Sequence, residues 1–261
     1  MPTVTLSHRG LLNIGGSEAR PFLQRIVTAD LDALEADVAK PAALLSPQGK
    51  VLHEFLVSQD GEALRLDVSA AFLPDLARRL MMYRLHADVT FEPRPSAPVR
   101  AVWGEAAPLR DARFEDASIG RAYDEAPDTA TLAEWTALRI AHGVAELGTD
   151  YGADDLFPHD LGMPASGAVS VRKGCFVGQE VVSRMHHRGT GRRAVAAVSA
   201  EASLPDPGTP ITSGGRPLGT LGGTLECKGL AVVRTDRLAE AVDKGEDVLA
   251  GETAVELRPF A

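Results

Sequence analysis

The sequence predicts an α+β core followed by a small antiparallel β-barrel. In the first half of the chain, helix-like and strand-like segments follow in the order helix, strands, helix, strand, which favours helices packed over a sheet. After residue 193 the chain changes to short β-like pieces separated by Gly and Pro, as is typical of a small barrel. A length of 261 residues allows one to two domains. We therefore expect a core over residues 1–193, divisible into subdomains 1–98 and 99–193, and a barrel over residues 194–261.

The first part of the core carries clear local signals. Residues 17–29 are expected to form a helix whose apolar side is Phe22, Leu23, Ile26 and Val27. Residues 42–69 read as strands separated by two turns, and Asp60-Gly61 between alternating runs is a strong hairpin signal. A second helix is expected over residues 70–85, and a further strand over residues 87–92.

The rest of the core is less regular. Residues 99–103 are expected to form a strand, and residues 129–143 a helix that Asp128 or Thr129 caps and Gly143 ends. Leu132, Trp135, Leu138 and His142 share one face of this helix. Residues 104–128 and 144–172 are irregular and rich in turns. The barrel strands are expected in residues 194–200, 216–226, 229–235 and 253–258.

Bulk composition excludes several classes of protein. The formal net charge of −9 argues against a general nucleic-acid-coating protein, so nucleic acid is expected to be involved only indirectly. No window approaches the ~18 apolar residues of a membrane helix, and the first residues lack the features of a signal peptide. Two cysteines cannot make a disulfide scaffold. We expect a cytoplasmic, monomeric protein with reduced thiols that does not bind membranes.

The basic residues are unevenly distributed along this acidic chain. Residues 172–193 hold six Arg or Lys side chains against the single acid Glu180, with four glycines and the cysteine Cys175 among them. One interpretation is a solvated basic loop. The other is an anion site, because glycines let backbone N–H groups approach a ligand and Arg forks suit carboxylates and phosphates.

Common catalytic and metal motifs are absent from the sequence. There is no P-loop, dinucleotide fingerprint, HExxH or GxSxG. The adjacent His186 and His187 would point in different directions, and Cys175 and Cys227 form no CxxC pair, so we expect no tightly bound metal. Cys175 follows two cations that would favour its thiolate, although a small core residue is the alternative. Trp135 is either a core residue or a flat wall for a planar heterocycle.

Several motifs resemble those of one known family. Lys173 to Glu180, KGCFVGQE, resembles the KGC[YF]xGQE signature of the YgfZ family of folate-binding proteins, which are similar in fold to the aminomethyltransferase (GcvT) of the glycine cleavage system. The family's other motifs are matched in the same order along residues 5–195. They are matched by Ile14 to Gly16, Phe22 to Asp30, Leu44 to Lys50, Asp111 to Arg113 with Gly120 and Arg121, Leu138 to Asp150, and Phe157 to Asp160.

The resemblance implies a fold, a cofactor and a set of site residues. It implies a GcvT-like folate-binding core, with sheet layers and helices around a central channel, and a C-terminal β-barrel. The expected cofactor is tetrahydrofolate or a derivative, lying against Trp135. Arg9 stands near the place of a second family tryptophan and could meet a folate carboxylate. Cys175 is the expected functional thiol. The further cofactor-binding residues are expected to be Lys173, Gly174, Gly178, Gln179, Glu180 and Arg184.

Three functions are compatible with these observations. The preferred one is a folate-binding accessory protein for assembly or repair of iron–sulfur enzymes, with an effect on tRNA modification and with iron–sulfur client or assembly proteins as partners. The second is a folate-dependent one-carbon transferase using Glu54, Asp150 or Asp160 as acid or base. Glycine-cleavage activity itself is not expected, since His53 replaces an acid of that enzyme and its TGYTGE segment is missing. The third is an RNA- or protein-binding module built on residues 172–193.

Overall fold

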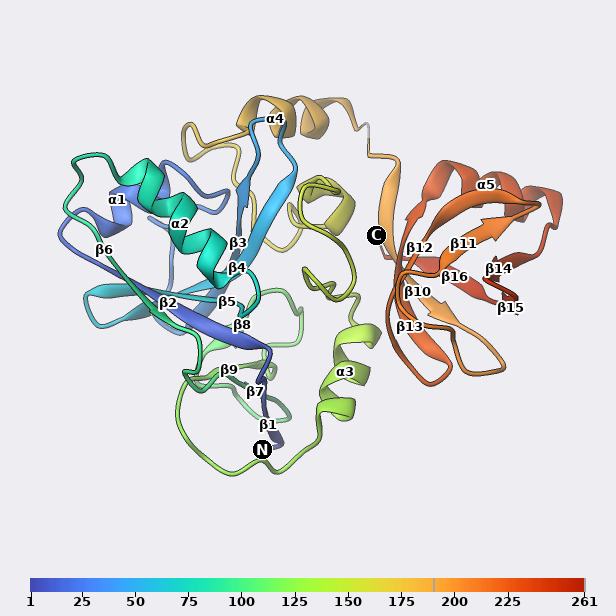
Figure 1. Cartoon of the computed structure of the whole chain (residues 1–261), viewed down its shortest axis with the longest axis horizontal. Helices are drawn as coiled ribbons and strands as arrows, with labels where there is room; N and C mark the ends of the chain where they lie inside the picture. Colours follow the sequence, from blue (N-terminus) through green and yellow to red (C-terminus); the bar gives the residue numbers. More distant parts are fainter. Residues whose placement is uncertain (190, 261) are drawn as a thin grey trace.

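The protein contains two β-sheets, which are formed by different parts of the chain. A computed structural model describes residues 1–189 and 191–260. Within them, a nine-stranded sheet has the order β1-β7-β9-β8-β3-β4-β5-β2-β6, and a seven-stranded sheet has the order β15-β14-β11-β12-β13-β10-β16. The two sheets lie on opposite sides of helix α3 (Figure 1). The predicted α+β class is confirmed.

The nine-stranded sheet forms the framework of the core. All its pairs are antiparallel except β3 with β8. Because β1 pairs with β7, and β3 with β8, one sheet crosses the expected subdomain boundary at residue 98. The division into subdomains stays a prediction. The strands are β1 (Thr3–Thr5), β2 (Arg9–Gly15), β3 (Val38–Leu45), β4 (Val51–Asp60), β5 (Ala63–Ser69), β6 (Thr90–Arg94), β7 (Arg100–Val102), β8 (Arg110–Asp111) and β9 (Gly120–Ala122).

Helices α1 (Ala19–Gln24) and α2 (Leu73–Arg84) cover one face of this sheet. α1 is shorter than the predicted helix over residues 17–29. The chain leaves the helix because the Thr28 amide donates to the Ala43 carbonyl on β3, at 3.0 Å, while the Thr28 hydroxyl accepts from the Ala43 amide, at 2.9 Å. The apolar residues after α1 therefore reach the core through turns that follow the sheet.

The third helix, α3 (Leu132–Ala141), begins three residues later than predicted. Thr131 is its N-cap, in a capping box with Glu134. The expected cap Asp128 instead accepts a hydrogen bond from the Thr5 amide at 2.8 Å, which fixes the incoming segment to β1. After α3, the turn-rich residues and the short 3-10 helix η1 (Pro158–Leu161) cover the other face of β3 and β4.

Two further helices were not predicted. α4 (Gln179–Arg188) buries only Val182, so no apolar stripe marks it in the sequence. α5 (Thr235–Lys244) buries Leu238 and Ala241 against the second sheet. That sheet consists of β10 (Arg193–Ser199), β11 (Pro210–Ser213), β12 (Arg216–Leu225), β13 (Lys228–Arg234), β14 (Val248–Ala250), β15 (Thr253–Ala254) and β16 (Glu256–Pro259). No helix in the described ranges is long and apolar enough to cross a membrane.

The second sheet is joined to the core through a glycine pair. The Asp150 carboxylate accepts from the Gly223 amide on β12 at 2.8 Å and also pairs with Arg139 of α3. A Cβ on Gly222 would lie 2.9 Å from the Asp150 Cα, so only glycine permits this approach. The core and the second sheet are therefore held in one fixed arrangement by a buried charge.

We predict that Gly222→Ala weakens this junction. The added methyl group would collide with backbone that cannot move freely, at a cost of about 1–3 kcal/mol in the free energy of unfolding. Urea denaturation followed by circular dichroism measures the loss. The matched control is Gly152→Ala, where an added Cβ meets nothing within 4 Å. Equal stability of the two variants would contradict the prediction.

Candidate functional site

A cavity of about 800 Å³ opens between the core and the second sheet. Its walls come from β3, β4, the segment after β8, the end of α3, η1 and β10. It is lined partly by charged or titratable side chains: Arg9, Glu54, Arg110, Arg113, Glu115, His142, His159 and Asp160. Its apolar wall includes Phe55, Phe114, Leu161, Met163, Val195 and Phe260. The contribution of Ala194, Val195 and Phe260 makes it a site that the core alone does not complete.

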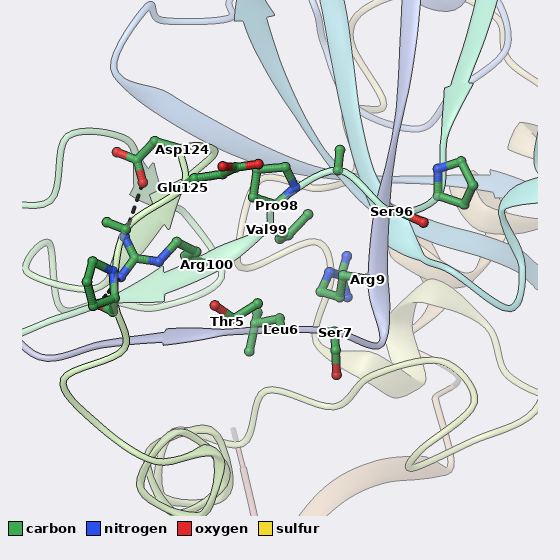
Figure 2. Close-up of a pocket in the computed structure, with 14 residues that line it drawn as sticks. Thr5, Leu6, Ser7, Arg9, Ser96, Pro98, Val99, Arg100, Asp124 and Glu125 are labelled. Carbon is green, nitrogen blue, oxygen red and sulfur yellow. Dashed lines mark hydrogen bonds and ion pairs between the residues drawn. The ribbon is translucent and has the colours of Figure 1, made fainter.

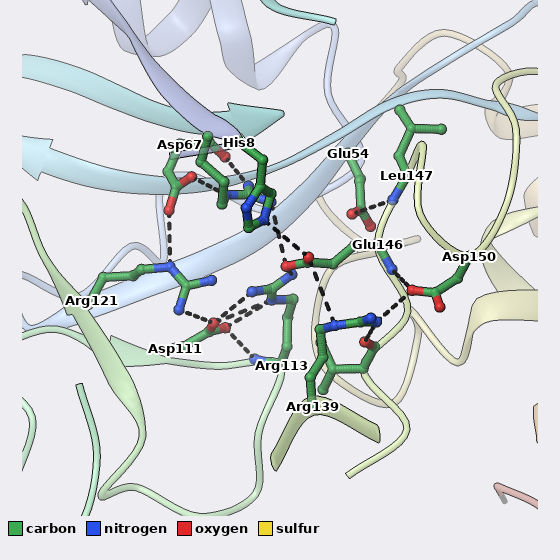
Figure 3. A network of polar contacts seen from close by, with 12 residues as sticks. His8, Glu54, Asp67, Asp111, Arg113, Arg121, Arg139, Glu146, Leu147 and Asp150 are labelled. Carbon is green, nitrogen blue, oxygen red and sulfur yellow. Dashed lines mark hydrogen bonds and ion pairs between the residues drawn. The ribbon is translucent and has the colours of Figure 1, made fainter. Parts of the chain in front are cut away.

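A buried network of ion pairs, called the ionic floor below, lies beside this cavity (Figure 3). Asp67 on β5 pairs with Arg9 of β2 and, at 3.0 Å, with Arg121 of β9. Arg121 reaches Asp111 at 3.2 Å, and Asp111 binds Arg113 at 2.8 Å. These side chains come from strands far apart in the sequence, so the network fixes the strands' relative positions.

Glu146 extends the same network toward α3. Its carboxylate lies 3.5 Å from Arg9 and 3.4 Å from Arg113, and 3.8 Å from Arg139. Burial opposes its ionisation, but the His8 ring, 3.6 Å away, and the three guanidinium charges outweigh burial and hold the pKa of Glu146 well below its usual range. Acidic and basic side chains in the floor of the cavity therefore pair with one another.

Glu54 is a buried carboxyl on the cavity wall that has no ion pair with any described residue. It accepts from the Leu147 amide at 3.0 Å and from the Tyr151 hydroxyl at 2.8 Å. Burial raises the pKa of Glu54, against the opposing charge of Arg113. The neighbouring His53 points to the opposite face of β4, where its ring lies 3.0 Å from Asp75 of α2. Strand alternation therefore brings Glu54, and not His53, to the cavity.

Phe114 lies on the cavity lining, whereas Trp135 lies behind it. Trp135 is only 1% exposed and does not line the cavity. Its indole packs against Phe114, with ring centroids 5.5 Å apart, against Trp103 at 6.1 Å, and over the Arg121 guanidinium at 5.0 Å. Phe114 lies on the lining. Trp135 therefore packs one layer behind the cavity, and its direct contact with a ligand stays a prediction.

Of the three arginines on the lining, Arg9 and Arg110 differ in what they can offer a ligand. Arg9 is 3% exposed and already pairs with Asp67 and Glu146, so its charge is committed. It also lines a second hollow of about 630 Å³, where Arg100 binds Asp124 at 3.1 Å (Figure 2). Arg110 is half-buried and has no side-chain hydrogen bond or ion pair within residues 1–189 and 191–260. Arg110 is thus the cation that remains available on the cavity wall.

The KGCFVGQE segment lies outside the cavity. Lys173 donates to the Gln24 carbonyl at the end of α1, and burial lowers its pKa to about 8. Gly178 has a φ of +79°, and a Cβ there would lie 2.6 Å from the Ser46 carbonyl oxygen. The Gln179 side chain accepts from the Phe176 amide at 3.3 Å, which closes the loop before α4. The segment thus packs against the turn between β3 and β4.

The predicted site residues of this segment are brought together with each other and not with Trp135 or Arg9. Cys175 is exposed at the tip of the loop. Gly174 has a φ of +99° with open space around it, and Glu180 pairs with Arg184 at 2.8 Å on the exposed side of α4. None of them is on the lining of this cavity, and their part in cofactor binding stays a prediction.

Only the end of the basic segment approaches the cavity. The His186 ring on α4 lies 6.1 Å from the ring of His159, which is on the lining. Arg193 binds Asp155 at 3.2 Å. Over the described ranges, no group of three or more His, Cys, Asp or Glu residues could hold a metal ion.

Apart from Arg9 and Asp150, the residues of the ionic floor were not selected as site residues from the sequence. Asp111, Arg113 and Arg121 stand in one of the matched motifs, and Arg139, Glu146 and Asp150 in another. Their spacing showed no recognisable catalytic pattern, since the partners meet only in the folded sheet. The sequence feature that indicates these residues is that arginines and acidic residues occur together inside motifs that are otherwise apolar.

Comparison with known proteins gives a consistent picture. The family description "CAF17, C-terminal beta-barrel domain" matches residues 192–261, which confirms the predicted barrel. A mitochondrial iron–sulfur cluster assembly factor IBA57 homolog from Chaetomium globosum is 30% identical over 237 residues, covering 73% of this chain and 54% of the relative. The chain spans about half the length of this and the next fungal relative, at 54% and 55%.

Two other relatives match over nearly the whole chain. The mitochondrial IBA57 of Mus musculus is 25% identical, over 96% of this chain and 83% of its own. The tRNA-modifying protein YgfZ of Yersinia pestis is 24% identical, over 99% of this chain and 92% of its own. A crystal structure of the glycine cleavage system aminomethyltransferase T of Bartonella henselae superimposes on 100% of the chain with a TM-score of 0.75 at 14% identity, covering 85% of that structure. The GcvT-like fold is confirmed.

We predict that Asp67→Asn destabilises the protein strongly. The substitution removes one negative charge from the buried network and leaves an excess positive charge shared by Arg9 and Arg121, which costs about 3–5 kcal/mol in the free energy of unfolding. Chemical denaturation measures it. Asp236→Asn is the matched control, because its partner Arg234 sits in an exposed pair that water screens. A similar change in both variants would contradict a special role for the buried network.

We also predict a pH-dependent effect of Glu54→Gln. Because the folded-state pKa of Glu54 is raised, its stabilising contribution is full below the unfolded pKa of about 4.3 and is lost as pH rises through the folded value. The variant should gain stability relative to the parent across that window, by about 1.4 kcal/mol for each pH unit between the two pKa values. Denaturation at several pH values tests this. A constant difference between the two proteins would contradict it.

Proposed function

We propose that this chain, which belongs to the YgfZ family, is a folate-binding accessory protein in the assembly or repair of iron–sulfur proteins. The names of its relatives support this role, since they include iron–sulfur cluster assembly factors and a tRNA-modifying protein. The observation that carries the folate part is the cavity between core and barrel, with one available cation on its wall. An effect on tRNA modification would follow from an iron–sulfur client.

The cavity fits a reduced folate in size and in lining. Pockets of about 300–1,000 Å³ hold ligands of this class, and the volume here is about 800 Å³. A folate has a planar ring system with N–H donors at one end and carboxylates at the other. Phe114 offers an aromatic surface, Glu54 and Asp160 offer acceptors, and Arg110 offers a guanidinium.

Each of these residues has a distinct part in the proposed complex. Arg110 binds a carboxylate of the ligand's tail, since its guanidinium has no protein partner in the described structure. Glu54 accepts from the ring's N–H groups while Tyr151 and Leu147 hold its side chain. The ionic floor excludes water and keeps Arg9 and Arg113 in place. When bound, a reduced folate supplies or accepts one-carbon units.

Cys175 has its proposed role outside the folate cavity. Its loop is anchored by Gly178 against the turn after β3 and by Lys173 against α1, which leaves the thiol exposed at the surface. We place the contact with an iron–sulfur client or assembly protein at this thiol. The cytosol is the proposed location, whereas the IBA57 relatives are named as mitochondrial.

A one-carbon transferase is the second candidate, and Glu54 is the observation that favours it. A buried carboxyl with a raised pKa on a cavity wall holds its proton more readily than an exposed carboxyl and is suited to proton transfer. Asp150 is not available for this chemistry, because it is committed to Arg139 and to the Gly223 amide. Formation of methylene-tetrahydrofolate from an amine donor would support this candidate.

We predict saturable binding of tetrahydrofolate that depends on Arg110. Titration calorimetry with the full chain should show one site, and Arg110→Ala should weaken the affinity about 10- to 100-fold, as expected for a hydrogen-bonded charged group. Tryptophan fluorescence should also respond, since Trp103 and Trp135 pack behind Phe114.

Arg216→Ala is the control for this titration. Arg216 lies on the far sheet in an exposed pair with Glu240, so its removal should leave folate affinity unchanged. Absence of saturable heat, or equal affinity in the Arg110→Ala variant and the parent, would overturn the folate assignment.

A further inference from the structure

We propose that the groove between α1 and the end of α2 is a docking site for an acidic, apolar-anchored peptide segment of another protein. The groove holds about 540 Å³ and lies on the side of the core away from the barrel (Figure 1). The inference goes beyond the proposed function and does not depend on folate binding.

The first observation is a concentration of exposed apolar side chains. Seven large apolar side chains are exposed in the described ranges, and four of them fall within five consecutive residues, at Met81, Met82, Tyr83 and Leu85. Exposed apolar patches of this kind mark contact sites, whereas single exposed side chains are ordinary. Methionine and tyrosine are also the residue types enriched in protein interfaces.

The groove has a preformed apolar floor beneath this patch. Phe22 and Ile26 form the floor at 2% and 6% exposure, and Tyr83 and Leu85 form its rim. An apolar side chain of a partner could therefore be buried there without rearrangement of the core.

The charges around the groove select the kind of partner. Arg25, Arg84 and His86 line it, and none has a side-chain hydrogen bond or ion pair within the described residues. The one acid on the lining, Glu18, is engaged by the Asp88 amide at 2.7 Å. The lining therefore presents uncompensated positive charge on a protein whose net charge is −9, which favours an acidic segment.

Leu85 has a strained backbone conformation and an exposed side chain. Leu85 has φ 49° and ψ −110°, a conformation that glycine adopts easily and leucine rarely. Its side chain is 82% exposed, so no packing in the chain repays that strain. Strained, exposed residues of this kind are found at functional surfaces.

The surface also adjoins the exposed thiol. The Gln24 carbonyl at the end of α1 accepts from Lys173, two residues before Cys175 in the sequence. Arg25 of the groove follows Gln24 directly. A partner seated on the groove therefore lies beside the anchor of the Cys175 loop.

The test is selection of random twelve-residue peptides displayed on phage against the full chain. Enriched sequences should combine Asp or Glu with aromatic or aliphatic residues. A labelled peptide of the enriched sequence should bind saturably in fluorescence anisotropy, more weakly at 300 than at 50 mM salt (about 2-fold or more).

Substitutions then locate the contact. Leu85→Ser and Arg84→Glu should each weaken the peptide at least about 5-fold, while Val242→Ser on α5 and Arg188→Glu on α4 should change it less than about 2-fold. Leu85→Gly separates binding from folding: it should weaken the peptide while leaving the melting temperature unchanged or higher. Folate affinity should be the same in all these variants.

Several results would overturn the inference. They are the absence of enriched peptides, enriched peptides without acidic residues, and equal sensitivity to groove and control substitutions. A concentration-dependent dimer that Leu85→Ser abolishes would assign the surface to a second copy of the chain. Binding to phosphatidylserine vesicles with the same sensitivity would assign it to an anionic membrane.

Discussion

The pairing of Asp67 with Arg9 and Arg121 is the interaction on which the rest of the structure depends. All three side chains are buried, and each comes from a different strand of the nine-stranded sheet. An isolated buried charge is too costly to keep, so the three strands must meet in one register. The same constraint extends to α3 through the ion pairs of Asp111, Arg113 and Glu146. It extends to the barrel through Asp150, which accepts a hydrogen bond from the Gly223 amide. The cavity lies beside this network, and Arg9 and Arg113 of the network are on its lining.

The sequence predicted the parts of the fold that local patterns determine. The strands over residues 42–69 and the helix over residues 70–85 have strict periodicity, and the structure has both in nearly those places. α4 was missed because its faces are polar, with one buried residue. β2 was not predicted because apolar and polar residues do not alternate along its sequence, RGLLNIG. The resemblance supplied the overall architecture that periodicity could not.

The candidate site was only partly predictable, for a similar reason. The KGCFVGQE segment is contiguous, so its residues could be named together. The cavity is assembled from β3, β4, α3, η1 and β10, and nothing local indicates that Arg110 and Phe114 line it together. Trp135 was named from the resemblance, but the layer in which a side chain lies depends on packing that one sequence does not display. The strong positive charge of residues 172–193 turned out to lie mainly on an exposed loop and helix.

The glycine pair at Gly222 and Gly223 has a consequence for the modularity of this protein. A barrel that met the core through ordinary side chains could be exchanged or lost during evolution with little effect on the rest. Here its backbone supplies a hydrogen bond to a carboxylate that the core has already committed to Arg139. Removing the barrel would leave that carboxylate short of a donor and remove one wall of the cavity. The two sheets therefore depend on each other structurally, although the chain reads as two modules.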